Sequence, residues 1–278
     1  MVKIWTTETR KIRQGTVLCL KTQLFDDGGG AWYTLEKMTE ERTGAGMKIH
    51  GLQKMTLLDY PGKVACTVFF GGCDFRCPFC HNWELLDGSC PAVMEDDELL
   101  AFLEKRTGLL DGVVVTGGEP LLQKELPDLL RKIRAMGYPV KLDTNGNHPE
   151  SLKALVRDGL VNYVAMDIKN APDRYAQTVG METLDLSAVR ESVRFLMEGD
   201  TEYEFRTTVV RELHDDLSFL GIRDWIAGAK HYYLQYFTDR DTVPFEGFHA
   251  PTEAEMTRWA DLVREKVPSV SVRGAGTP

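Results

Sequence analysis

The stretch ACTVFFGGCDFRCPFCHN, residues 65–82, joins a short apolar run to a loop that carries three cysteines. The run Ala65–Phe70 is apolar nearly throughout, as expected for a strand of a parallel sheet that is covered on both faces. The spacing of Cys73, Cys77 and Cys80 fits several groups. It contains the Cys-x-x-Cys-His pattern of c-type haem attachment, a Cys-x-x-Cys pair typical of zinc or redox sites, and three thiols that could hold an iron–sulfur cluster.

Apolar runs like the first one recur along the chain and alternate with amphipathic stretches. The other strand candidates are Gly112–Thr116, Val140–Asp143, Tyr163–Asp167, Tyr203–Val210 and His231–Phe237. The helix candidates are Asp96–Lys105, Leu126–Met136, Pro149–Val156, Leu186–Met197, Leu217–Ala227 and Thr252–Val267. Six strand-then-helix units in series predict an α/β fold of parallel strands. The regular spacing favours a partial (β/α)6 TIM-type barrel, with a doubly wound sheet as the alternative.

Composition excludes several classes of partner. The 278 residues carry 33 basic and 42 acidic side chains, a net charge of −9, whereas a nucleic-acid-binding surface is basic and clustered. The longest apolar run near the amino terminus, Val17–Leu20, is too short for a secretory signal, and no later run is long enough to span a membrane. We therefore expect a cytoplasmic protein with no nucleic-acid or membrane partner.

The amino-terminal part of the chain differs from the rest. Residues 1–46 contain three consecutive glycines, Gly28–Gly30, and show no clear period, and they end just before Met47. We expect them to be an N-terminal extension that is either disordered or not part of the native protein. The remaining residues, 47–278, are predicted to form one domain.

Three arguments favour an iron–sulfur cluster at the cysteine loop. Haem attachment belongs to exported compartments, and disulfides are disfavoured in the cytoplasm. Zinc ligation by Cys80 and His81 would require adjacent ligands on one tetrahedral ion, and a redox pair leaves Cys73 unexplained. Three thiolates leave one iron of a [4Fe–4S] cluster open to a small molecule. The other cysteines are too dispersed for a second cluster; they are Cys19, Cys66 and Cys90.

Polar residues follow the later strand candidates, where a barrel gathers its catalytic groups. Gly117 and Gly118, in TGGEP, would permit close approach of the backbone to a ligand, and Glu119 could accept hydrogen bonds from an ammonium group. The alternative is an ordinary turn. Lys169, in MDIK, is a candidate clamp for a carboxylate or a ribose. The segment LDTNG, residues 142–146, fits either a ligand site or a turn.

The motifs CDFRCPFC and GGEP resemble those of the radical S-adenosylmethionine (SAM) superfamily. The resemblance implies a [4Fe–4S] cluster on Cys73, Cys77 and Cys80, whose open iron is chelated by the amino and carboxylate groups of SAM. The residues that it places at SAM are Phe79, Gly117, Gly118, Glu119, Asp143, Lys169, Arg206 and Gln235, of which Arg206 and Gln235 also fit as ordinary interior residues. The segments DTNG and MDIK are similar to those of glycyl-radical-enzyme activators within this superfamily. That similarity implies a monovalent cation at Asp143, Thr144 and Asp167.

Within that superfamily, the opening GLQKMTLLDYPGK, residues 51–63, resembles the activating proteins of anaerobic ribonucleoside-triphosphate reductase. This resemblance covers Met47 to the end. It implies that flavodoxin or ferredoxin reduces the cluster, that SAM is cleaved to a 5′-deoxyadenosyl radical, and that this radical takes a hydrogen from a glycine of the partner. The segment LQYF, residues 234–237, lacks the histidine of pyruvate formate-lyase activators. Alternatives are another glycyl-radical activator, a small-substrate enzyme such as 7-carboxy-7-deazaguanine synthase, or a non-catalytic zinc or haem protein.

Overall fold

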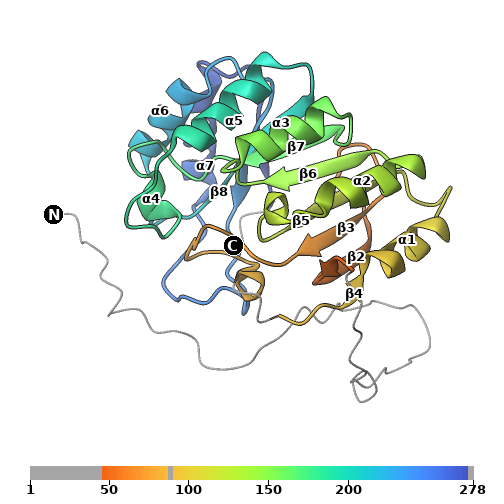
Figure 1. The fold of residues 1–278 in the computed structure, drawn as a ribbon. Coiled ribbons are helices and arrows are strands. Elements are labelled where there is room, and N and C mark those ends of the chain that lie inside the picture. Colours follow the sequence, from red (N-terminus) through yellow and green to blue (C-terminus); the bar gives the residue numbers. More distant parts are fainter. Residues whose placement is uncertain (1–45, 87–89, 275–278) are drawn as a thin grey trace.

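The computed structural model describes residues 46–86 and 90–274 (Figure 1). The expected extension, residues 1–46, lies outside the described residues apart from Gly46. One sheet of eight strands organises the described part, in the order β10-β9-β8-β7-β6-β5-β3-β2. Its strands are β2 (Gly51–Thr56), β3 (Ala65–Phe70), β5 (Gly112–Gly117), β6 (Val140–Thr144), β7 (Tyr163–Asp167), β8 (Glu202–Val209), β9 (Tyr232–Tyr236) and β10 (Val270–Arg273).

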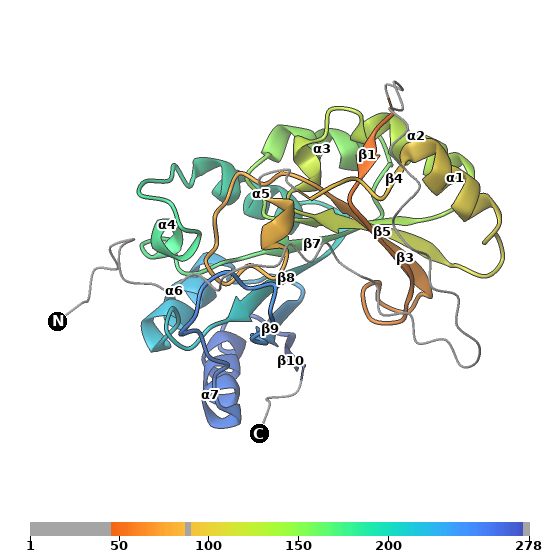
Figure 2. The ribbon, with the colours of Figure 1, turned by 90° about the horizontal axis from the view of Figure 1, so that it is seen from below.

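The strand order decides between the two predicted architectures. From β3 to β10 each strand pairs in parallel with the next strand of the series, whereas β2 is an antiparallel edge. Because right-handed crossovers in an unreversed order put every helix on one side, the sheet curves as a barrel wall. Figure 2 shows the helices along the outer side of this open, curved sheet. The partial barrel and the six predicted strands are confirmed.

Seven α-helices in the described residues connect the strands. They are α1 (Asp96–Glu104), α2 (Leu126–Ala135), α3 (Pro149–Arg157), α4 (Tyr175–Thr178), α5 (Ser187–Glu198), α6 (Asp216–Trp225) and α7 (Glu253–Arg264). The α7 helix begins with a capping box, in which Thr252 Oγ1 accepts from the Glu255 N–H at 3.2 Å and Glu255 Oε2 from the Thr252 N–H at 2.7 Å. None of the described helices is long and apolar enough to cross a membrane.

Four short elements complete the described fold. They are β1 (Lys48–Ile49), β4 (Met94–Glu95) and the 3₁₀ turns η1 (Trp83–Leu85) and η2 (Pro120–Leu122). The main hydrophobic core lies between the helices and the outer face of the sheet. A second, small cluster on the inner face joins Tyr60, Ala65 and Val114, with Tyr163 packed against it. Because Tyr60 precedes β3, this cluster fills the amino-terminal end of the barrel and leaves the carboxyl-terminal end for the site.

Candidate functional site

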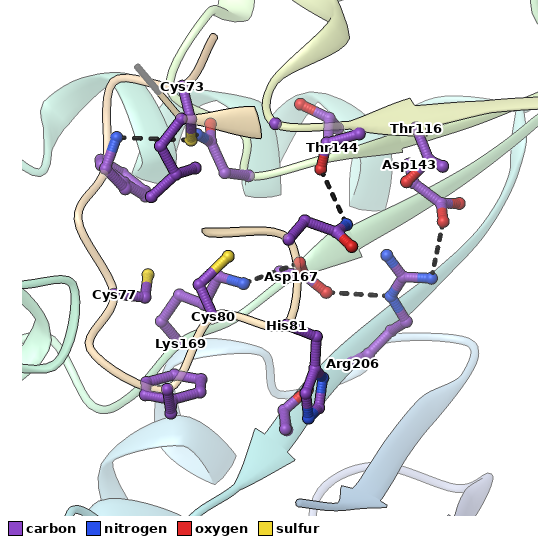
Figure 3. Close-up of a pocket in the computed structure, with 18 of the residues that line it drawn as sticks. Cys73, Cys77, Cys80, His81, Thr116, Asp143, Thr144, Asp167, Lys169 and Arg206 are labelled. Atoms are coloured by element: carbon purple, nitrogen blue, oxygen red, sulfur yellow. Dashed lines mark hydrogen bonds and ion pairs between the residues drawn. The ribbon is translucent and has the colours of Figure 1, made fainter. Parts of the chain in front are cut away.

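The carboxyl ends of the parallel strands and the loop after β3 surround one pocket (Figure 3). The predicted residues that line it are Cys73, Cys77, Phe79, Cys80, Gly117, Gly118, Asp143, Thr144, Asp167, Lys169, Arg206 and Gln235. Glu119 is not among the lining residues. Residues distant in the sequence therefore meet where the barrel topology brings successive strand ends together.

The cysteine loop presents its three thiols to this pocket. Cys73 Sγ accepts a hydrogen bond from the Phe75 N–H at 3.4 Å, and the Cys80 N–H donates to the Cys77 carbonyl at 3.0 Å, which closes a tight turn. Burial raises the pKa of Cys73 and Cys77 to about 12 and that of Cys80 to about 11. Buried thiols of this kind ionise when a metal centre supplies compensating positive charge. The donor set therefore fits a cluster held by three thiolates.

His81, the candidate fourth zinc ligand, is engaged elsewhere. Its ring stacks on Phe237 with centroids 5.5 Å apart, and its Nε2 lies 2.7 Å from the Thr238 carbonyl oxygen. Among the described residues, no three His, Cys, Asp or Glu side chains lie close enough to bind one metal ion. These contacts of His81 with Phe237 and Thr238 argue against a zinc site on Cys73, Cys77, Cys80 and His81.

Asp74 fastens the cysteine loop to the segment that follows β6. Its Oδ1 accepts from Asn145 Nδ2 at 2.7 Å, and its Oδ2 lies 2.6 Å from Asn147 Nδ2 and 3.0 Å from His148 Nε2. Burial opposes ionisation of this carboxyl, yet these three hydrogen bonds hold its pKa down, to about 2. Asn145 Nδ2 also lies 3.9 Å from Cys73 Sγ. Asp74 and Asn145 therefore position the first thiol, a role that the sequence analysis missed.

Gly117 and Gly118, predicted to let the backbone approach a ligand, also lie close to the backbone at and just after the end of β3. A Cβ on Gly117, whose φ is +128°, would lie 2.9 Å from the carbonyl carbon of Phe70, and one on Gly118 would lie 2.6 Å from that of Gly72. The Gly118 N–H donates to the Phe70 carbonyl at 2.9 Å. Both glycines line the pocket. Their lack of a side chain is also required because the backbone of Phe70 and Gly72 lies against them.

Glu119 lies behind the pocket wall with its carboxylate fully buried. Its Oε1 accepts from the Leu121 N–H and the Thr144 hydroxyl, both at 3.0 Å, and its Oε2 accepts from the Asn145 N–H at 2.7 Å. Since the carboxylate is used by the chain itself, it joins the ends of β5 and β6. Burial raises the pKa of Glu119 to about 7 in spite of these donors.

We predict that Glu119→Gln lowers the free energy of unfolding of the cluster-free protein by about 1–3 kcal/mol, because the amide leaves a buried donor without an acceptor. A carboxyl whose pKa is raised on folding contributes stability below its unfolded pKa, near 4.5, and loses it as the pH rises towards 7. The variant should therefore lack this decline. Urea denaturation of both proteins at pH 5 and pH 7.5 measures it; parallel pH dependences would contradict the prediction.

A network of ion pairs forms the wall of the pocket opposite the cysteine loop. Arg206 donates through Nε to Asp167 at 2.9 Å and through a terminal nitrogen to Asp143 at 3.1 Å, as Figure 3 shows. Lys169 Nζ donates to the other oxygen of Asp167 at 2.8 Å, and Lys141 Nζ to the other oxygen of Asp143. Burial alone would raise the pKa of both carboxyls, but Arg206 and the two lysines hold it below its ordinary value.

Seven other lining residues were not among those predicted to contact the cluster or SAM. They are Phe75, His81, Asn82, Leu86, Thr116, Asn145 and Thr208. Thr116, Asn145 and Thr208 lie at or just after the ends of β5, β6 and β8, the position that served to find Asp143 and Lys169. Applying that positional rule to every polar residue would have found these three.

Comparison with known proteins agrees with this geometry. A family model described as "Radical SAM superfamily" matches residues 67–216. A Methanocaldococcus jannaschii protein named for glycyl-radical enzyme activation is 28% identical over 233 residues, which are 81% of this chain and 95% of that protein. The pyruvate formate-lyase-activating enzyme of Clostridium pasteurianum is 36% identical over 138 residues, which are 45% of this chain and 54% of that enzyme.

The fold is likewise shared with a solved structure. The crystal structure of Streptococcus suis SuiB bound to S-adenosylmethionine superposes with a TM-score of 0.59 at 11% sequence identity, over 75% of this chain and 52% of that one. The matched family segment runs from β3 to the start of α6 and contains the three cysteines and the ends of β5, β6, β7 and β8. The chain belongs to the radical SAM superfamily.

Proposed function

We propose that this protein activates a glycyl radical enzyme, and that its partner is an anaerobic ribonucleoside-triphosphate reductase. The observation that carries the activating function is the match over 95% of the length of the archaeal protein named for that activity. Residues 47–278 are the proposed catalytic domain. When bound, a [4Fe–4S] cluster supplies the electron that cleaves SAM, and the chain binds, orients and shields the reactants.

The pocket supports an assignment of roles. Cys73, Cys77 and Cys80 hold the cluster. Lys169 and Arg206 present positive charge to the carboxylate of SAM, as befits groups that form charge-assisted hydrogen bonds. The remaining contacts to SAM are assigned to Phe79, Gly117, Gly118, Asp143 and Gln235. Glu119 is assigned a positioning role, because its carboxylate acts on Thr144 and Asn145.

The choice of partner is supported by the segment GLQKMTLLDYPGK. In the structure this segment forms β2 and the turn to β3, where the ring of Tyr60 would lie 3.0 Å from a Cβ on Gly112. Its later part, around Tyr60, lies at the amino-terminal end of the barrel, whereas Gly51 pairs with Phe69 near the carboxyl end of β3. The motif supports kinship with the reductase activators. Flavodoxin or ferredoxin is the proposed electron donor.

The test is radical formation on candidate partners. The protein is reconstituted anaerobically with iron and sulfide, reduced, and mixed with SAM and either an anaerobic ribonucleotide reductase or pyruvate formate-lyase. A glycyl-radical EPR signal on the reductase alone supports the proposal. A signal on pyruvate formate-lyase alone replaces the partner. SAM cleavage with no radical on either enzyme, together with formation of 7-carboxy-7-deazaguanine from its precursor, would overturn the activating function.

A further inference from the structure

The two carboxylates expected to bind a monovalent cation are already paired with the protein's own cationic groups, one donor on each oxygen. Asp143 receives Lys141 on Oδ1 and Arg206 on Oδ2, and Asp167 receives Arg206 on Oδ1 and Lys169 on Oδ2. The Thr144 hydroxyl donates to Glu119 and accepts from the Gly146 N–H at 3.1 Å. Because all four carboxylate oxygens already accept from ammonium or guanidinium groups, which also balance their charge, this set does not fit a further cation.

Lys141 is the unusual member of this network. It lies on β6 two residues before Asp143, so the two side chains project from the same face of the sheet. Its side chain is only 2% exposed, which is rare for a lysine and requires a partner. Its Nζ donates to Asp143.

The other buried carboxylate near Lys141 is balanced independently. Glu204, fully buried on β8, accepts two hydrogen bonds from Arg273, both at 2.7 Å, and one from the Tyr163 hydroxyl at 2.9 Å. Because this bidentate pair compensates the charge of Glu204, the ammonium of Lys141 is left to compensate Asp143.

We propose that the Lys141 ammonium is the resident counter-cation of this site, in the place where a monovalent metal ion was expected. It compensates part of the charge of Asp143, so that Arg206 is shared between Asp143 and Asp167 where it lines the pocket. SAM binding by this protein is then independent of K⁺ and Na⁺. The inference rests on the proposed function, because it takes SAM to be the ligand of this pocket.

The decisive measurement is the Kd for SAM of the reconstituted full-length protein in choline chloride, KCl and NaCl at equal ionic strength. For the unmodified protein we expect Kd values that agree within about twofold. An ion that binds the SAM-free and the SAM-bound protein equally does not change the affinity for SAM. For Lys141→Met we expect binding about tenfold weaker in choline, the size of effect typical of groups that orient a ligand. KCl or NaCl should restore the affinity for SAM, because the Asp143 oxygen that no longer accepts from Lys141 can then bind the ion.

Two variants serve as controls. Lys132→Met removes a half-exposed lysine paired with Asp96, outside the site, and should leave Kd unchanged in every salt. Lys141→Gln keeps a donor without the charge and should resemble Lys141→Met. A Kd of the unmodified protein that improves about tenfold in KCl, or Lys141 variants that hold the cluster but are rescued by neither ion, would overturn the proposal.

A second readout needs no SAM and separates this inference from the proposed function. In urea denaturation, the midpoint of Lys141→Met should rise when KCl replaces choline chloride, whereas the midpoint of the unmodified protein should not. If the unmodified protein binds no SAM in any salt, the proposed function fails, and the denaturation series alone decides the role of Lys141. The proposal is overturned if the midpoint of the unmodified protein rises in KCl. It is also overturned if the midpoint of Lys141→Met does not rise.

Discussion

Replacing Cys77 with alanine is expected to abolish both cluster binding and SAM cleavage. Cys77 is buried, and its thiol, with a pKa raised to about 12, lines the same pocket as Cys73 and Cys80. Losing one of three thiolates leaves a second iron without a protein ligand. Groups that merely orient a ligand contribute about 10- to 100-fold to affinity or activity, so removing the ligand itself should exceed about 100-fold.

Iron and sulfide content after anaerobic reconstitution, together with the EPR spectrum of the reduced protein, measures this prediction. The matched control is Cys66→Ala, which also removes one buried cysteine. Cys66 lies on β3 with its side chain in the core between sheet and helices, so the variant should lose roughly 1 kcal/mol of stability but keep its iron. Full iron content in Cys77→Ala, or its loss in Cys66→Ala, would refute the cluster assignment.

The strands and helices were predictable where the apolar pattern is strong. The run ACTVFF forms β3 as expected, because an almost fully apolar segment of this length suits a strand covered on both faces. The edge strands were missed. β2 (GLQKMT) exposes Gln53, Lys54 and Met55 in succession and shows no alternation, and β10 (VSVR) is only four residues long. Edge strands of this kind carry little periodic signal.

The site was predictable as far as it follows from spacing and strand ends. The sequence could not show which strand ends are neighbours, so the contact of Asp74 with Asn145 was missed. Glu119 was expected at the ligand because it follows Gly118, but it is the residue before the η2 turn and its carboxylate accepts from the Leu121 N–H. Lys141 was readable in principle, since charges two residues apart in an apolar strand face the same side.

Replacing Gly118 with alanine is expected to lower the free energy of unfolding by about 4 kcal/mol, among the largest effects of a single substitution. The new Cβ would lie 2.6 Å from the carbonyl carbon of Gly72, closer still to its oxygen, and 3.3 Å from Cys73 Cβ. The obstacle is backbone and cannot rotate away. The loops after β3 and β5 must therefore separate, which stretches the 2.8 Å hydrogen bond from the Glu119 N–H to the Gly72 carbonyl.

The matched control separates this clash from ordinary backbone strain. Gly137 has a φ of +91°, and a Cβ added to it would meet no atom within 4 Å, so Gly137→Ala bears only the left-handed penalty of about 1–2 kcal/mol. Gly118 lies outside the left-handed region, so its effect is steric. Urea denaturation of both variants compares the two effects, and iron content reports whether Cys73 has moved. If Gly118→Ala is no less stable than Gly137→Ala and binds its full iron, the close approach of these two loops does not hold the cysteine loop in place.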